Sequence, residues 1–109
     1  METISVVLSV KTDRIAEFEA GFRSHELAIW RDYLERGVLV RASLTKMDIS
    51  SQPVAGATQY LIVAVFADGE GHHLHDNDPR FAAWNEMADA YQIGSGMAFG
   101  GETLIHLDA

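Results

Sequence analysis

Runs of alternating or continuous apolar residues, separated by polar turns, predict four β-strands. They cover residues 3–10, 38–47, 60–67 and 97–107, and each is rich in β-branched, aromatic or other apolar side chains. The pair Gly100-Gly101 lies inside the last of these segments and indicates a bulge or kink there.

The spacing of apolar residues between the first two strands predicts one long helix of about six turns. Thr12 or Asp13 would cap its start, and Gly37 stands where a C-terminal cap belongs. At 100° per residue the following side chains fall in one narrow stripe: Ile15, Phe18, Phe22, Ile29 and Tyr33.

A second helix is predicted after the third strand. Asp78 occupies the N-cap position and Pro79 the first helical position, and the helix ends near Gly94. Its apolar positions at helical spacing are Phe81, Trp84, Ala88 and Tyr91. Residues 48–59 contain Pro53 and Gly56 and are predicted to form a surface loop.

The resulting order is βαββαβ, which predicts an α+β, ferredoxin-like fold with two helices on one face of a four-stranded antiparallel sheet. A chain of 109 residues has room for one domain, so we expect residues 1–109 to form a single domain.

Both faces of the predicted sheet are apolar. In the third strand one face carries Tyr60, Ile62, Ala64 and Phe66, and the other carries Leu61, Val63 and Val65. Two helices cover only one face, so the other would expose an apolar patch of several hundred Å². We therefore expect a homodimer in which two sheets pack face to face.

Charge and composition exclude several classes of function. Sixteen acidic against eight basic residues give a formal net charge of −8, which repels nucleic acid and anionic membranes. There is no cysteine, hence no disulfide framework and no thiolate site. No apolar run approaches the roughly 20 residues of a membrane span, and no signal peptide is evident, so we expect a cytoplasmic protein.

Two polar residues flank the apolar stripe of the first helix. His25 and Glu26 lie on opposite sides of it, where a purely structural helix would carry Leu or Ala. They would border a cavity between helix and sheet, with His25 as a general acid or base because imidazole titrates near neutral pH. The alternative is that the stripe ends there and His25 is half exposed.

The run from His72 to Asp78 concentrates three histidines and two carboxylates in seven residues. Such ligands bind divalent metals, but their spacing matches no established metal site, and a solvated loop with Asp78 as a helix cap explains most of the run. We predict no metal. Leu74 would anchor the segment, leaving His75 or His73 as the candidate that faces inward.

Aromatic residues and one arginine supply candidate ligand contacts. Trp30, Tyr60 and Trp84 would contribute to the core or form the wall of a pocket for an aromatic ring or a sugar. Arg41 belongs to a largely buried sheet and therefore requires a carboxylate partner or a ligand.

The chain resembles the dimeric α/β-barrel superfamily. Residues 75–81, His-Asp-Asn-Asp-Pro-Arg-Phe, are similar to the H-x-x-x-P-x-F segment of antibiotic-biosynthesis monooxygenases, and residues 35–37 occupy the place of their E-P-G turn. More weakly, His25 followed by Trp30, and the W-x-x-M pattern from Trp84, resemble L-rhamnose mutarotases.

These resemblances imply different activities. The monooxygenase resemblance implies oxidation of a phenolic or polyketide-like substrate without a cofactor, with His25 or His75 as the base and with Trp84 and Tyr60 as an apolar wall. The mutarotase resemblance implies ring opening of an aldose, with His25 as acid and base and Trp84 stacked on the sugar. A non-catalytic dimer that binds a ligand, or is merely structural, remains a third hypothesis because fold does not determine function.

Overall fold

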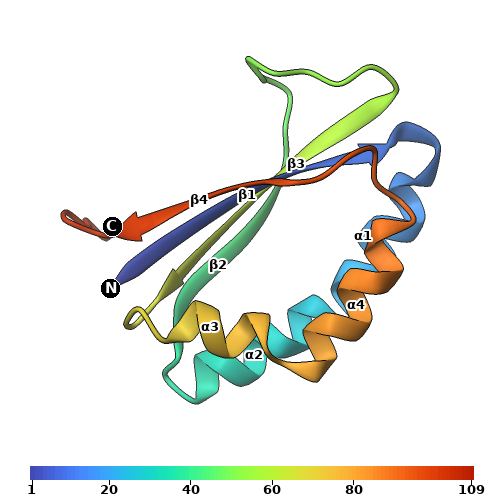
Figure 1. Cartoon of the computed structure of the whole chain (residues 1–109). Coiled ribbons are helices and arrows are strands. Elements are labelled where there is room, and N and C mark those ends of the chain that lie inside the picture. The colour runs from blue at the N-terminus through green and yellow to red at the C-terminus, as the bar shows by residue number, and fades with distance from the viewer.

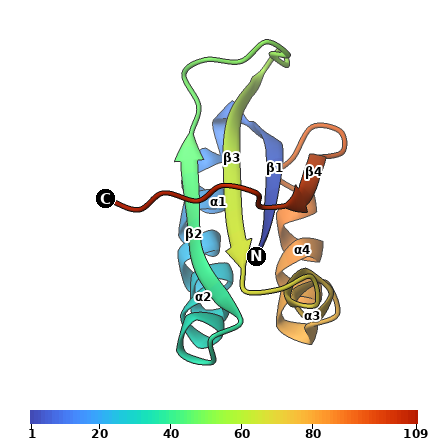
Figure 2. The same ribbon diagram turned by 90° about the vertical axis from the view of Figure 1, so that its left-hand side faces the viewer.

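A computed structural model describes all 109 residues. Its strands form one antiparallel sheet in the order β2-β3-β1-β4, and the long helices cover one face of it (Figures 1 and 2). The elements are β1 Glu2–Lys11, a 3₁₀ turn Thr12–Arg14, α1 Ile15–Ser24, α2 Glu26–Glu35, β2 Leu39–Lys46, β3 Ala57–Phe66, α3 Gly71–Asp76, α4 Pro79–Asp89 and β4 Met97–Glu102. The predicted α+β, ferredoxin-like fold is confirmed.

The core lies between the inner face of the sheet and the helices. Alternate residues of β1 and β3 point to this face, because successive side chains of a strand point to opposite sides. The largest fully buried side chains are Tyr33, Tyr60, Phe18, Ile29 and Val10. The helical stripe predicted from the sequence supplies three of these five, so its assignment to the core is confirmed.

The first helix is interrupted, contrary to the prediction of a single helix of six turns. His25 separates α1 from α2 with φ −115° and ψ −66°. The Ser24 hydroxyl donates a hydrogen bond to the carbonyl of Ala20, one turn earlier, at 3.0 Å. Bonds of this kind bend helices, and Gly21 in the same turn weakens the helix further. α2 is therefore not a straight continuation of α1.

Three element boundaries and one bulge also differ from the predictions. α4 ends at Asp89 rather than near Gly94. β3 begins at Ala57, inside the predicted loop, and β4 ends at Glu102 rather than continuing to residue 107. The pairing of β4 with β1 is regular through Gly100, and the bulge lies instead in β2 between Leu39 and Arg41. A Cβ at Gly100 would lie 2.4 Å from Ile4 Cδ1, so this glycine makes room for the Ile4 side chain.

Part of the histidine-rich run is helical, where the sequence predicted a solvated loop. Residues Gly71–Asp76 form α3, and Asp78 then caps α4 as predicted. A Cβ at Gly71 would lie 2.5 Å from the Phe66 ring, so only glycine permits α3 to start this close to the end of β3.

The C-terminal tail, residues 103–109, crosses the outer face of the sheet (Figure 2). Four contacts hold it. At its start the Thr103 amide donates to the Met1 carbonyl at 2.9 Å, and Thr103 Oγ1 lies 2.6 Å from Thr3 Oγ1. Further along, Arg41 donates a hydrogen bond to His106 Nδ1 at 3.3 Å and lies 3.9 Å from Asp108 Oδ1. Val65 pairs with both Thr3 and Arg41 in the sheet, and only 3% of it is exposed, although it belongs to the outer face. The tail thus covers part of this face.

No helix of the structure is long and apolar enough to cross a membrane.

The N-cap of α4 gives a testable contribution to the stability of the fold. Asp78 accepts hydrogen bonds from the Arg80 amide at 2.9 Å and from the Tyr33 hydroxyl at 2.8 Å. We expect Asp78→Ala to lower the free energy of unfolding, measured by urea denaturation, by about 0.5 to 2 kcal/mol. Asp78→Asn retains a good N-cap and should lose less. An alanine variant as stable as the wild type would show that Asp78 contributes nothing to capping.

Candidate functional site

A cavity of about 160 Å³ lies between the inner face of the sheet and helices α2, α3 and α4. Eleven of its sixteen lining residues are hydrophobic, so it favours an apolar ligand. The apolar wall from the sheet consists of Ile4, Val6, Leu8, Ile62, Ala64 and Phe66. The helices add Phe22, Trp30, Phe81, Trp84 and Ala88.

A buried carboxylate and a half-buried imidazole form the inner polar part of this cavity. Glu26, the first residue of α2, is only 4% exposed, and its Oε1 lies 2.5 Å from Nε2 of His75 in α3. The other ring nitrogen, Nδ1, lies 3.5 Å from Asp76 Oδ1. The imidazole packs on Phe81 with ring centroids 4.3 Å apart. The pair therefore joins α2 to α3 at the cavity wall.

The second oxygen of Glu26 has no partner. Oε2 is buried and accepts no hydrogen bond from any protein group. Leaving a buried charged acceptor unsatisfied is costly, and such groups in native proteins indicate a functional role or a bound water, ion or ligand.

The surroundings of His75 change its titration. Burial lowers the pKa of its ring, but the hydrogen bond and charge of Glu26, together with Asp76, outweigh this effect and raise the pKa above its usual 6.5. The ring therefore carries a proton at higher pH than a free imidazole does.

More polar groups line the outer part of the cavity. His72 lies one turn before His75 on α3, and its Nδ1 bonds to Glu2 Oε1 of β1. Asp76 and Asn85 also line the cavity, and both are exposed residues. This gradient from buried apolar to exposed polar side chains identifies the opening of the cavity.

Trp84 forms a cavity wall and separates the cavity from His25. The indole is 4% exposed and stacks on the imidazole of His25, with centroids 5.6 Å apart and planes 16° apart. His25 itself is exposed and does not line the cavity. Of the two residues that flank the predicted stripe, Glu26 reaches the cavity and His25 does not.

The remaining predicted ligand contacts are divided among three places. Trp30 lines the cavity. Tyr60 is fully buried at a separate groove beside β2, where its hydroxyl donates to Glu19 Oε2 at 2.5 Å. Arg41 lies on the outer face of the sheet with Asp108 as its carboxylate partner, 3.9 Å away. The cavity thus brings together His75, Trp30 and Trp84.

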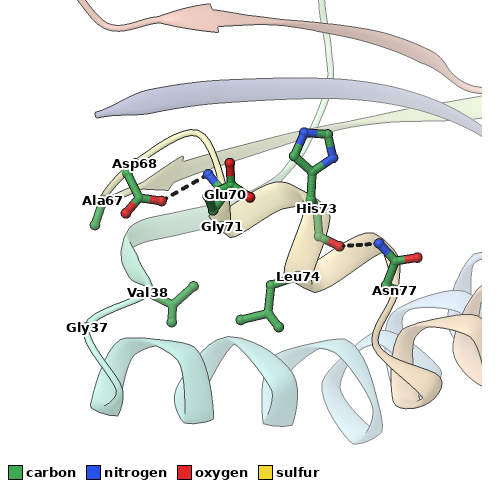
Figure 3. Close-up of a pocket in the computed structure, with 9 residues that line it drawn as sticks. All are labelled: Gly37, Val38, Ala67, Asp68, Glu70, Gly71, His73, Leu74 and Asn77. Carbon is green, nitrogen blue, oxygen red and sulfur yellow. Dashed lines mark hydrogen bonds between the residues drawn. The ribbon is translucent and has the colours of Figure 1, made fainter.

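A wider hollow lies beside α3, between this helix and the start of β2 (Figure 3). Its volume is about 530 Å³, but its polar members Asp68, Glu70, His73 and Asn77 are all exposed. Figure 3 shows the His73 ring pointing away from the apolar residues of the hollow. Since it contains no buried polar group, we do not take it as the site.

Leu74, predicted to anchor the segment, lines this hollow and is 42% exposed. No group of three or more His, Asp or Glu side chains is arranged to hold a metal ion.

Comparison with known proteins identifies the fold. No family model matches the sequence, and no curated protein matches it. Among solved structures, one antibiotic biosynthesis monooxygenase aligns with a TM-score of 0.71 at 12% identity, covering 96% of this chain and 100% of that one. The chain has the fold of these monooxygenases.

Two further structures support this assignment. SnoaB from Streptomyces nogalater, a cofactor-independent oxygenase, has a TM-score of 0.67 at 18% identity over 99% of this chain and 98% of its own. HapK from Hahella chejuensis has a TM-score of 0.72 at 19% identity over 100% of this chain and 98% of its own. The resemblance proposed from sequence is confirmed as a likeness of fold.

The buried pair predicts a pH dependence of stability. Because folding raises the pKa of His75, protonated His75 stabilises the native state fully below about pH 6.5, and this contribution is lost as pH rises through the folded pKa. The difference in free energy of unfolding between wild type and His75→Gln should therefore shrink above pH 6.5. For one proton the slope is at most about 1.4 kcal/mol per pH unit. A difference that grows with pH would contradict this arrangement.

Proposed function

We propose that the chain binds a phenolic or polyketide-like ring compound in the cavity beside Glu26 and His75 and oxidises it with molecular oxygen, without a cofactor. The observation that carries the proposal is the Glu26–His75 pair, because both residues line an apolar cavity and Glu26 Oε2 is buried without a hydrogen-bond partner. The shared fold with SnoaB, named as a cofactor-independent oxygenase, agrees with it.

The size of the cavity limits what enters it. A protein cavity of about 150 Å³ accommodates benzene, so the 160 Å³ here accepts one aromatic ring. A larger ring system would extend through the opening near His72, Asp76 and Asn85. An aldose fits less well, because its hydroxyl groups need several polar partners and most of the lining is apolar.

The reaction begins with proton transfer. The pair takes the hydroxyl proton of the phenol, and the phenolate carries negative charge on its ring carbons. One such carbon transfers an electron to O₂ and combines with it, forming a C–O bond and a peroxide anion, which takes back the proton held by the pair and becomes a hydroperoxide. Loss of the remaining proton on that carbon breaks the O–O bond, leaving a quinone carbonyl and water. Phenol and O₂ thus give quinone and H₂O, and the apolar wall keeps other water from the carbanion.

Oxygen consumption tests this function. The double variant Glu26→Gln, His75→Gln should lower O₂-dependent turnover of hydroxylated aromatics such as resorcinol by about 100-fold or more, since positioned acid–base groups contribute 10² to 10⁴. His73→Gln, on the exposed side of the same helix, is the matched control. No O₂ uptake with any phenol in the wild type would refute the proposal. Loss of turnover in His25→Ala, with the double variant unaffected, would move the site to His25.

We also propose that the chain is a homodimer formed through the outer face of the sheet. Phe99 of β4 is 63% exposed there, next to Ser5 of β1. In the tail that crosses this face, Leu104, Ile105 and Leu107 are 86 to 90% exposed. Four such side chains on one side of a small chain favour burial against a second copy.

Light scattering tests the dimer. The wild type should have twice the 12.0 kDa mass of the chain, and Phe99→Asp should shift it toward the monomer because a buried charge opposes association. Ile49→Asp is the control, since Ile49 is 84% exposed in the loop before β3. A wild type that remains at 12.0 kDa at micromolar concentration excludes the dimer.

A further inference from the structure

We infer that Glu26 Oε2 is the atom that accepts the ligand's proton, that His75 is a positioning residue held as an imidazolium, and that the cavity selects a neutral compound whose hydroxyl-bearing ring enters it. This inference rests on the proposed site and assigns separate roles to its two polar residues.

Both ring nitrogens of His75 face carboxylate oxygens, one through a hydrogen bond and the other at ion-pair distance. Nε2 lies 2.5 Å from Glu26 Oε1, and Nδ1 lies 3.5 Å from Asp76 Oδ1. A neutral imidazole donates from one nitrogen only, so its other nitrogen would direct a lone pair at a carboxylate. An imidazolium donates from both. Because both nitrogens face carboxylates, the geometry favours the protonated ring, and a protonated ring cannot take a proton from a substrate.

Other charged groups around His75 do not change this assignment. From α3, His72 is already bonded to Glu2 of β1. From α2, the Tyr33 ring meets the imidazole edge-on at 6.1 Å and directs its hydroxyl to Asp78. No unpaired cation faces the ring, so nothing displaces its proton.

Glu26 retains one oxygen for a ligand. Its side chain is 5% exposed, Oε1 is bonded to His75, and Oε2 is buried without a partner. A ligand hydroxyl that donates to Oε2 satisfies this oxygen and is thereby placed for loss of its proton. The imidazolium fixes the carboxylate through Oε1 and balances its charge.

Charge and size define the class of ligand. A carboxylate at the wall, Asp76 at the opening and a net charge of −8 all oppose an anionic ligand such as a benzoate. An aromatic ring without a hydroxyl would fill the cavity but leave Oε2 unsatisfied. The ligand that meets both conditions is a neutral phenol whose hydroxyl-bearing ring occupies the cavity.

The affinities of phenol and anisole test the inference, because anisole has a methoxy group in place of the hydroxyl and so cannot donate a hydrogen bond. Calorimetry or ligand-observed NMR should show wild type binding phenol about tenfold to 100-fold more tightly, the range of a hydrogen bond to a charged group. Glu26→Gln keeps the side-chain shape and the bond to His75, but turns an amide NH₂ toward the cavity. It should lose the preference.

His75→Gln is the matched variant. It should keep the preference for phenol, because the acceptor stays on Glu26. Its turnover should fall, because the Glu26 carboxylate is no longer held in position. Loss of the preference in His75→Gln but not in Glu26→Gln would make His75 the acceptor and overturn the inference. Equal affinity for phenol and anisole in the wild type, or binding of neither, would also overturn it.

The ring state of His75 gives a readout independent of ligand. Long-range ¹H–¹⁵N spectra of the wild type at pH 7 should show both nitrogens of His75 protonated, and Glu26→Gln should lower the pH at which the ring titrates. A neutral His75 ring at pH 7 in the wild type would refute the assignment.

These outcomes are separable from failure of the proposed oxygenation. Phenol selectivity that depends on Glu26, without O₂ uptake, would leave the binding site intact and refute only the oxygenase function. O₂ uptake that survives in Glu26→Gln would leave the oxygenase function intact and refute the role of Glu26 as the proton acceptor.

Discussion

The close packing of Trp84 against Gly21 determines how the helices cover the sheet. A Cβ at Gly21 would lie 2.5 Å from Trp84 Cζ3, so any larger residue would push α4 away from α1. The indole also meets Phe22 edge-on, with centroids 6.2 Å apart. Because these contacts fix α4 laterally, the space between α4, α2 and the sheet stays open as a cavity rather than closing. The wall that shapes the ligand site is therefore part of the core.

The buried carboxylate of Glu26 and the half-buried imidazole of His75 at the edge of this core lower stability. Transferring charged groups from water to a protein interior is unfavourable unless their pairing is good, and replacing such a pair by apolar residues often stabilises a protein. Here one oxygen of Glu26 is left unpaired as well. Titratable groups with this kind of burial and pairing concentrate at functional sites. We therefore attribute the pair to function rather than to folding.

The two faces of the sheet have separate roles. The inner face supplies the apolar floor of the cavity through residues such as Ile62 and Phe66. The outer face carries the tail, held through Thr3 and Arg41, and exposes further apolar groups. Arg41 shows the separation clearly: the sequence placed it on a largely buried sheet, but its side chain is 54% exposed on the outer face, where it pairs with Asp108 on the side away from the cavity.

The sequence by itself determined the order of elements, the core stripe and the cap at Asp78, because periodicity, β-branched runs and capping act between residues close in the chain. It also placed Glu26 and His25 at the borders of the stripe. It did not decide between them: in the structure Glu26 lines the cavity, and His25, at the break between α1 and α2, does not. The bond between Glu26 and His75 joins residues 49 positions apart, and the partner of Arg41 comes from the tail. Such contacts depend on how whole elements pack, so only the tertiary structure decided which polar residues form the site.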